Sequence, residues 1–155
     1  SQRDLKEIQT IFLADDDLDD RDLFEEAAAL IKPDIRIRTV RDGVELMGLL
    51  THPDQAPSWI FLDLNMPRKN GKECLNEIGK NKDLRHIPLV IYTTSLNPLD
   101  IEETFDMGAS YFLRKPNSFE ELKNLLQRVL QNQSVAKHER DGFVLNDSTP
   151  TPAGV

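Results

Sequence analysis

Five short apolar runs are spaced along the chain and predict five β-strands. They are Thr10–Ala14, Ile35–Val40, Trp59–Leu62, Leu89–Tyr92 and Tyr111–Leu113. The first, third and fourth runs are continuously apolar, which is typical of central strands in a parallel sheet that is covered on both faces. The second run alternates Ile and Thr with Arg, and this alternation indicates an edge strand with one solvent-facing side.

Helical patterns fill the intervals between these runs. The last helix has an apolar stripe with a 3.6-residue period, formed by Phe119, Leu122, Leu126, Val129 and Leu130. Asn97-Pro98 predicts the start of another helix, as cap and first position, and Gly108 predicts its end. The first helix is expected to begin in the acidic segment after residue 15, with Asp19 or Asp20 as its cap. Its buried face is predicted to be Leu23, Ala27, Leu30 and Ile31.

Strands that alternate with helices predict an α/β fold in which helices cover both faces of a parallel sheet. We expect one domain over residues 8–131. From there the chain turns polar, and residues 132–155 predict a tail that is flexible or loosely docked. Within the tail, Phe143-Val144-Leu145 is an apolar island. We take it as a chance feature, the alternative being a segment that docks as an added edge strand.

Composition excludes several classes of function. The formal net charge of -8 disfavours direct DNA binding, because an acidic surface repels the nucleic-acid backbone and no cluster of Lys and Arg offsets it. No apolar run approaches the roughly 20 residues of a membrane helix. The single Cys74 has no internal disulfide partner, which favours a reducing compartment, the cytoplasm.

Polar side chains lie at the ends of four of the predicted strands. They are Asp15–Asp17, Asp63, Thr93–Ser95 and Lys115. Ligands bind beyond the carboxyl ends of the strands in an open parallel sheet, so we expect these groups to converge on one rim.

Elementary electrostatics limits what such a rim can do. Two carboxylates about 4 Å apart repel by roughly 4 kcal/mol at an effective dielectric near 20, so several of them together require a cation. Oxygen ligands without His or Cys favour Mg²⁺, Mn²⁺ or Ca²⁺ over zinc. A carboxylate beside such a metal can attack a phosphoryl group, whose oxygens Lys115 and a Thr hydroxyl would help to neutralise.

Four segments in this order, IFLADDD, FLDLNMPRKNG, VIYTTS and GASYFLRKP, resemble bacterial response-regulator receiver domains. The resemblance extends over about Thr10 to Leu130. It implies a flavodoxin-like, doubly wound fold with a five-stranded parallel sheet in the order 2-1-3-4-5.

The resemblance also implies the residues of a phosphorylation site. Asp63 matches the phosphoacceptor. Asp15 and Asp16 match the acidic pair that holds Mg²⁺ together with Asp63, Asp16 as the more direct ligand and Asp15 largely through water. Asn65 matches the position whose backbone carbonyl completes the metal shell.

Further positions match the parts that respond to phosphorylation. Thr93 matches the switch hydroxyl, although Thr94 or Ser95 are alternatives in the same run. Phe112 matches the switch aromatic residue, and Lys115 the residue that pairs with the phosphoryl group. The Lys115-Pro116 bond matches a peptide bond that is cis in the family, and Gly71 matches the glycine after the phosphorylation loop.

The function that follows is that of a single-domain response regulator. It would accept a phosphoryl group from a histidine kinase or a histidine phosphotransfer protein, and it would catalyse only its own phosphorylation and dephosphorylation. The segment RHIPLVIYTTS further resembles the group of regulators paired with bacteriophytochromes. Output then has to be docking, dimerisation or phosphate relay, so a second copy of the chain is one candidate partner.

Two other functions compete with this interpretation. A metal-dependent phosphohydrolase with an aspartyl nucleophile commonly has a second Asp two residues later as general acid, where this chain has Asn65. A receiver-like scaffold that is never phosphorylated is the third hypothesis, and the complete set of acid, hydroxyl and lysine argues against it.

Overall fold

The computed structural model describes residues 8–52, 56–131 and 138–146. Its strands are β1 (Thr10–Ala14), β2 (Arg36–Val40), β3 (Trp59–Leu62), β4 (Leu89–Thr93), β5 (Tyr111–Arg114) and β6 (Val144–Leu145). Its helices are α2 (Leu18–Ile31), α3 (Gly43–Leu50), α4 (Gly71–Lys80), α5 (Pro98–Asp106) and α6 (Phe119–Gln131).

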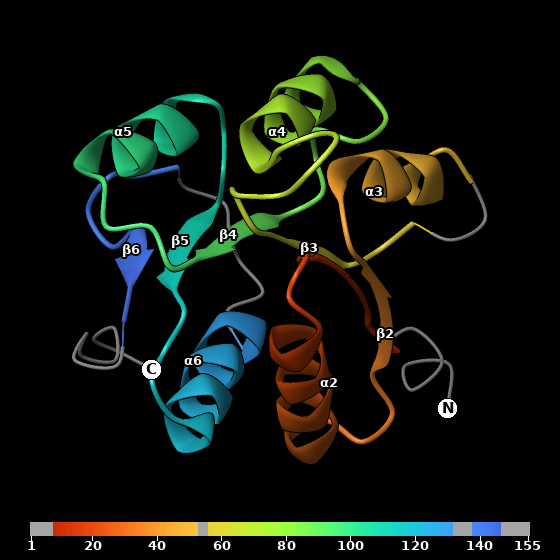
Figure 1. Ribbon diagram of the computed structural model, residues 1–155, viewed down its shortest axis with the longest axis vertical. Helices are drawn as coiled ribbons and strands as arrows, with labels where there is room; N and C mark the ends of the chain where they lie inside the picture. Colours follow the sequence, from red (N-terminus) through yellow and green to blue (C-terminus); the bar gives the residue numbers. More distant parts are fainter. Residues whose placement is uncertain (1–7, 53–55, 132–137, 147–155) are drawn as a thin grey trace.

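All strands of the sheet are parallel, in the order β2-β1-β3-β4-β5-β6. Helices α3, α4 and α5 cover one face, and α2 and α6 cover the other (Figure 1). The predicted doubly wound order 2-1-3-4-5 is therefore confirmed, and a sixth strand extends it beyond β5. The sheet reverses its winding between β1 and β3, where such folds place their ligands.

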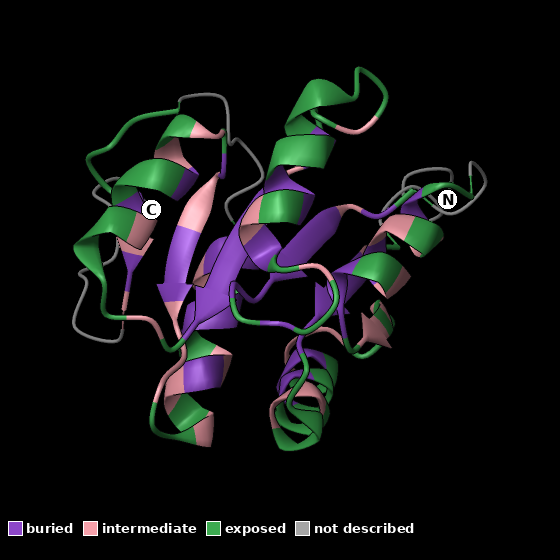
Figure 2. Cartoon of the chain, turned by 45° about the horizontal axis from the view of Figure 1, so that its top comes forward, coloured by how far each residue is buried: buried purple, intermediate pink, exposed green. Residues whose placement is uncertain are grey.

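Each face of the sheet has its own apolar core, because successive side chains of a strand point to opposite faces. Phe12, Ile60 and Phe112 pack under α3, α4 and α5. Trp59 and Phe61 pack under α2 and α6, and Trp59 is only 3% exposed. Figure 2 shows the strands as the buried centre of the molecule. A sheet buried on both faces explains why its central strands are continuously apolar in sequence.

The predicted ends of α5 are confirmed, whereas the cap of α2 is not Asp19 or Asp20. The Asn97 side chain accepts a hydrogen bond from the Leu99 amide at the start of α5, and Gly108 follows the helix with φ of 101°. At α2, however, Asp17 is the cap, and its carboxylate accepts from the Asp20 amide at 3.1 Å. The helix begins at Leu18, after only three residues that follow the end of β1, so Asp19 and Asp20 already lie in its first turn.

The predicted buried face of α2 is also only partly correct. Leu23 and Leu30 are 43% and 62% exposed, whereas Phe24 and Ala28 are buried together with Ala27. The Phe24 ring lies edge-on to the Phe61 ring, with 4.9 Å between centroids. The Phe24 ring also lies edge-on to Tyr92, so aromatic contacts with the sheet fix a rotation of the helix that differs from the one predicted from the two leucines.

The apolar island of the tail forms the sixth strand. β6 pairs with β5 in the register Phe112↔Val144 and Leu113↔Leu145, and Phe143 is 1% exposed. The interpretation as a chance feature is wrong, and the alternative of an added edge strand is correct. The physical reason is that the Phe143 side chain fills the space between α5 and the edge of β5. The domain limit at residue 131 stays a prediction, and residues 132–137 and 147–155 lie outside the described residues.

The prediction of a cis Lys115-Pro116 bond is wrong for this structure, because no described peptide bond is cis. The trans form is the intrinsically favoured one even before proline, by about 0.5–1 kcal/mol.

Candidate functional site

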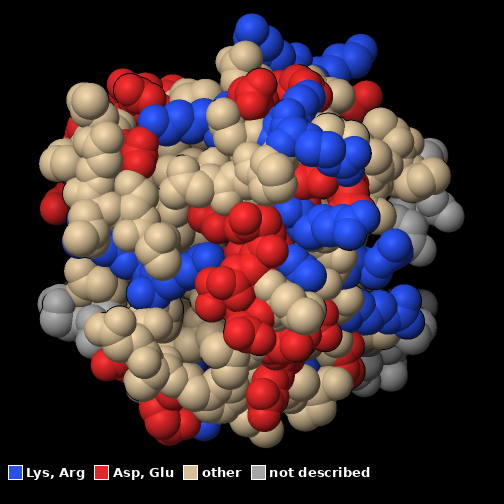
Figure 3. Space-filling view, viewed as in Figure 1, with Lys and Arg blue, Asp and Glu red and all other residues tan. Residues whose placement is uncertain are grey.

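The carboxyl ends of the strands bring the predicted polar side chains to one rim. Asp15 and Thr93 are fully buried, Asp63 is 5% exposed and the Lys115 side chain is 9% exposed. Figure 3 shows Asp and Glu side chains gathered near the centre of one face, between the two helix layers, with Lys and Arg side chains around them. Buried carboxylates and a buried ammonium are costly to desolvate, so their conjunction indicates a functional site.

Backbone hydrogen bonds fix the positions of the main chain at Asp15 and Asp63. The Asp15 amide donates to the Val40 carbonyl at 3.0 Å, and the Asp63 amide donates to the Ala14 carbonyl at 2.9 Å. Both residues thus continue the ladder of the sheet by one step beyond their strands. Their carboxylates consequently start from the most rigid part of the fold, which is where a precise site is best held.

The Lys115 ammonium is the centre of the rim. Its Nζ atom lies 2.8 Å from Asp15 Oδ2, 2.7 Å from Asp20 Oδ2 and 3.4 Å from Asp63 Oδ2. The Tyr92 ring lies beneath it, with 5.4 Å from Nζ to the ring centroid. One cation therefore balances three acids that come from β1, α2 and β3.

Burial and neighbouring charges shift the pKa values of Asp15 and Lys115 in opposite directions. Burial raises the pKa of Asp15 to about 6, although Lys115 and the Asp17 amide oppose the rise. Burial alone would lower the pKa of Lys115, but its contacts with Asp15 and Asp20, and the charge of Asp63, raise it. The lysine is thus held as a cation, while the most buried acid titrates close to neutral pH.

The same carboxylates offer a place for a divalent metal. Asp15, Asp16 and Asp63 each present one oxygen, and these three atoms lie within 4.8 Å of one another. Asp15 Oδ2 is buried and lies 2.8 Å from the Lys115 ammonium. Two buried carboxylates with an exposed Asp16 beside them fit a hard cation approached from solvent. Asn65 is exposed two residues after Asp63, at the same rim.

The loop after Asp63 is tied closely to the acid. The Gly71 amide donates to the Leu64 carbonyl at 3.0 Å, and a Cβ atom on Gly71 would lie 2.3 Å from the Asp63 carbonyl oxygen. No side chain fits in that space, which explains the glycine that the motif indicated. The start of α4 is thereby held directly against the backbone of Asp63.

An ion pair anchors the same loop to a neighbouring helix. Arg68, which has φ of 66°, donates from Nε to Asp42 Oδ2 at 2.8 Å. Asp42 also caps α3 by accepting from the Glu45 amide at 2.9 Å. The Arg68 guanidinium keeps the pKa of the Asp42 carboxyl below its usual value. The loop after Asp63 is consequently held both by the contact of Gly71 with Leu64 and by the ion pair of Arg68 with Asp42.

The two predicted switch residues are buried, and one of them begins a chain of polar contacts. The Thr93 hydroxyl accepts from the Ser95 amide at 3.3 Å, and the Ser95 hydroxyl in turn donates to Asp100. Asp100 is paired with Lys72 at 2.6 Å, which connects α5 with α4. Phe112, on the adjacent strand, is fully buried. These contacts connect Thr93 with the start of α5.

The sequence interpretation missed Asp20 as a member of the rim. It was assigned to the helix start, and its amide does bond to the Asp17 carboxylate there, but its side chain also binds Lys115. The signal was the direction of helical side chains, which lean toward the helix N-terminus. A carboxylate in the first turn after a strand end therefore reaches back over the rim.

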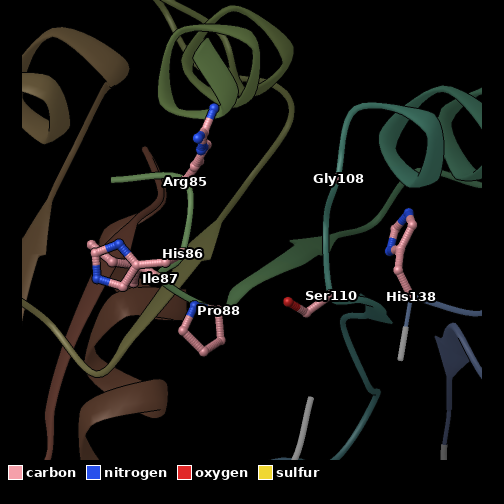
Figure 4. Close-up of a pocket in the computed structure, with 7 residues that line it drawn as sticks. All are labelled: Arg85, His86, Ile87, Pro88, Gly108, Ser110 and His138. Atoms are coloured by element: carbon pink, nitrogen blue, oxygen red, sulfur yellow. The ribbon is translucent and has the colours of Figure 1, made fainter. Parts of the chain in front are cut away.

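A shallow pocket of about 190 Å³ lies elsewhere, at the amino ends of β4 and β5. Arg85, His86, Ser110 and His138 are among its lining residues, and none of the rim residues is. In Figure 4 the two histidines stand on opposite sides and Arg85 points toward a helix. Its polar groups do not converge, so the pocket is not the candidate site.

The family of the chain is now clear. Residues 11–127 match the response regulator receiver domain, and the chain belongs to this family. It is 32% identical over 126 residues to response regulator Rcp1 of Synechocystis, covering 78% of this chain and 86% of the relative. Nothing in these comparisons supports the phosphohydrolase alternative.

Solved structures agree with this assignment. The phosphorylated cyanobacterial phytochrome response regulator RcpA superposes with a TM-score of 0.76 at 32% identity, over 84% of this chain and 97% of that one. A Mn²⁺-bound form of response regulator Rcp1 gives 0.71 at 28% identity, over 94% and 99%. The predicted resemblance to phytochrome-paired regulators is thus confirmed as similarity. Within the described residues, no helix is long and apolar enough to cross a membrane.

Proposed function

We propose that Asp63 is the phosphoacceptor of this response regulator and that Mg²⁺ is required for its phosphorylation. One observation carries the proposal: Asp63, Asp15 and Lys115 are buried together at the carboxyl ends of β3, β1 and β5, with the ammonium 3.4 Å from Asp63 Oδ2. This arrangement offers a nucleophile, a cation for the transferred group and a cluster of hard ligands within a few ångströms.

The proposed metal ligands are Asp15, Asp16, Asp63 and the backbone carbonyl of Asn65. Mg²⁺ binds through few carboxylates and keeps open positions for water and phosphate oxygens, so it suits a rim with one exposed and two buried acids. When bound, it would neutralise negative charge that develops on the phosphoryl oxygens.

The chain's own residues would carry out the transfer. An Asp63 carboxylate oxygen attacks phosphorus, the bond from phosphorus to the donor nitrogen breaks, and the donor imidazole keeps that electron pair. Lys115 needs no large movement to pair with the new phosphoryl group, because it already lies beside Asp63. Burial by the surrounding strands limits water around the acyl phosphate.

Phosphorylation would act outward through Thr93 and Phe112. The Thr93 hydroxyl would exchange its contact with the Ser95 amide for a phosphoryl oxygen, and Phe112 would fill the space that Thr93 leaves. Loss of the hydrogen bond between the Ser95 amide and Thr93 would release Ser95. Because the Ser95 hydroxyl donates to Asp100, the start of α5 would then change its position.

The proposed phosphodonor is a histidine kinase or a histidine phosphotransfer protein. A second copy of the chain is a candidate output partner, and the acidic surface argues against direct DNA binding. The cytoplasm is the proposed location, in keeping with the free thiol of Cys74.

The test is to incubate the protein with Mg²⁺ and a small phosphodonor such as acetyl phosphate and to measure its intact mass. We expect one phosphate per chain, and none when the metal is chelated. Rapid release of inorganic phosphate without accumulation of the adduct would instead indicate a hydrolase. Complete lack of reaction would indicate the unphosphorylated scaffold.

A further inference from the structure

Residues 138–146, here named the C-terminal cover, lie beyond the part of the chain that matches the receiver family, which ends at residue 127. Figure 1 shows their strand, β6, beside β5 at the edge of the sheet, on the side of α5. The cover therefore hides an edge that the receiver fold would otherwise leave open, and an open edge is a template for pairing with another strand.

Two apolar side chains anchor the cover. Phe143 is 1% exposed, and its ring centroid lies 5.2 Å from that of Phe105 on α5 and 6.3 Å from that of Phe112 on β5. Leu145 is 7% exposed and belongs to the core on the opposite face of the sheet. The Phe112 amide donates to the Phe143 carbonyl at 2.9 Å.

Arg128 on α6 donates to the Asn146 carbonyl at 3.2 Å, and other contacts of the cover lie at the surface. The His138 ring stacks on Phe105 with 3.9 Å between centroids, and its Nε2 atom lies 2.6 Å from the Phe105 carbonyl oxygen. Arg140 pairs with Glu102 at 2.7 Å, but the two side chains are 46% and 55% exposed, so this pair contributes little. The strand has two residues, and exposed side chains make part of its contacts, which favours reversible docking.

The Phe143 anchor and the strand pairing both contact Phe112. Its ring faces the Phe143 ring, its amide bonds to the Phe143 carbonyl, and its Cα pairs with Val144 in the register of the sheet. The cover thus contacts the residue that is proposed to move when Asp63 is phosphorylated. A change in Phe112 alters ring packing and strand pairing of the cover together.

We propose that the outer edge of β5 and α5 form a strand-docking surface, that the C-terminal cover occupies it in the unphosphorylated protein, and that phosphorylation of Asp63 releases the cover. The released surface presents the unpaired edge of β5 and the rings of Phe105 and Phe112. The partner that fits is an extended peptide with an aromatic residue followed by aliphatic ones, the chemistry of the cover itself. The release step rests on the function proposed above for Asp63 and Phe112.

Hydrogen exchange of the full chain tests the release. Peptides that contain residues 138–146 and Phe112 should be protected in the free protein, and beryllium fluoride with Mg²⁺, a phosphoryl mimic, should accelerate their exchange at least about fivefold. Fluorine NMR of the bound mimic establishes that the adduct has formed. A formed adduct with unchanged protection of the cover overturns the release while leaving the phosphoacceptor proposal intact.

Linkage supplies a second readout of the same coupling. If the adduct weakens the cover, weakening the cover must strengthen the adduct by the same factor. We expect Phe143→Ala to bind beryllium fluoride at least about fivefold more tightly, and Phe143→Leu to lie between it and the wild type. Glu139→Gln is the matched control, because Glu139 is exposed in the same segment. Equal affinities in Phe143→Ala and the control contradict the coupling.

A labelled peptide of residues 138–146 tests the docking surface independently of Asp63. It should bind to full-length Phe143→Ala without the mimic, and to the wild-type protein only with it. A peptide in which Ala replaces Phe143 should bind to neither. Failure of the native peptide to bind Phe143→Ala overturns the docking surface even if phosphorylation proceeds normally.

Discussion

The carboxyl end of β5 and its outer edge belong to the same strand but are built by opposite means. At the end, Lys115 is surrounded by carboxylates from three other elements. At the edge, Phe143 and Leu145 of a segment some thirty residues later complete an apolar surface. Charges that are buried together require a cation and so reveal their chemistry directly. Apolar contacts show only which side chains are neighbours. Their functional role has to be inferred from the other roles of those neighbouring residues.

The largest expected effect is the loss of phosphorylation without loss of the fold. Asp63→Asn should abolish the acyl phosphate, because an amide is not a nucleophile toward phosphorus under these conditions. The fold should persist, and so should the protection of β6 from hydrogen exchange. Intact mass after treatment with acetyl phosphate measures the first, and Asp22→Asn, an exposed aspartate on α2, is the control. A full phosphate adduct on Asp63→Asn contradicts the assignment.

A second change should damage the rim through its backbone. Gly71→Ala places a methyl group 2.3 Å from the Asp63 carbonyl oxygen, so we expect a loss of about 2 to 4 kcal/mol in unfolding free energy. Gly48→Ala, in α3, is the matched control because a Cβ there meets nothing within 4 Å. It should stabilise the protein by about 0.5–1 kcal/mol through helix propensity. Denaturant titration measures the stability of both variants, and similar stabilities would contradict a steric role for the close approach at Gly71.

A third comparison divides the acids of the rim. Asp16→Ala should lower the Mg²⁺ affinity at least about tenfold, since it removes one hard ligand from a site with few. Asp20→Ala should change it much less, because Asp20 is bound to Lys115 and is not a member of the three-carboxylate cluster. Isothermal titration with Mg²⁺ measures both. Equal losses would show that the two acids share one role.

The smallest effect is a dependence on pH. The pKa of Asp15 is raised to about 6 from 3.8, so the metal-free protein is stabilised when this carboxyl is neutral. That contribution is fully present below about pH 4 and is lost as the pH rises through about 6. Metal binding requires the ionised form, so the Mg²⁺ affinity should fall by about tenfold per pH unit below that value. An affinity that stays constant between pH 7 and pH 5 would exclude this coupling.

The sequence predicted the rim much better than the edge, for physical reasons. Asp63 follows a continuously apolar strand, and the parallel order of the strands brings it to Asp15 and Lys115 without any loop conformation having to be known. Asp20 was missed because its role depends on the residue at which α2 begins. The rotation of α2 depended on the contacts of Phe24 with Phe61 and Tyr92, which no periodicity encodes.

The sixth strand was predicted only as the alternative to a chance feature, because its balance of energies is close. Burial of Phe143 and Leu145 contributes about 1.5–3 kcal/mol each, and ordering each residue of the segment costs about 1–2 kcal/mol. Only the shape of the space beside Phe105 and Phe112 determines which side of that balance prevails.

The position of the only tryptophan decides what optical measurements will report. Trp59 begins β3, four residues before Asp63, and in an extended strand that separation is about 13 Å. Its indole lies in the core under α2 and α6, close to Phe61, rather than at the rim. Its fluorescence should therefore change strongly when the chain unfolds and little when a cation binds. Titrations of the rim will need a dye, a magnetic nucleus or calorimetry instead of intrinsic emission.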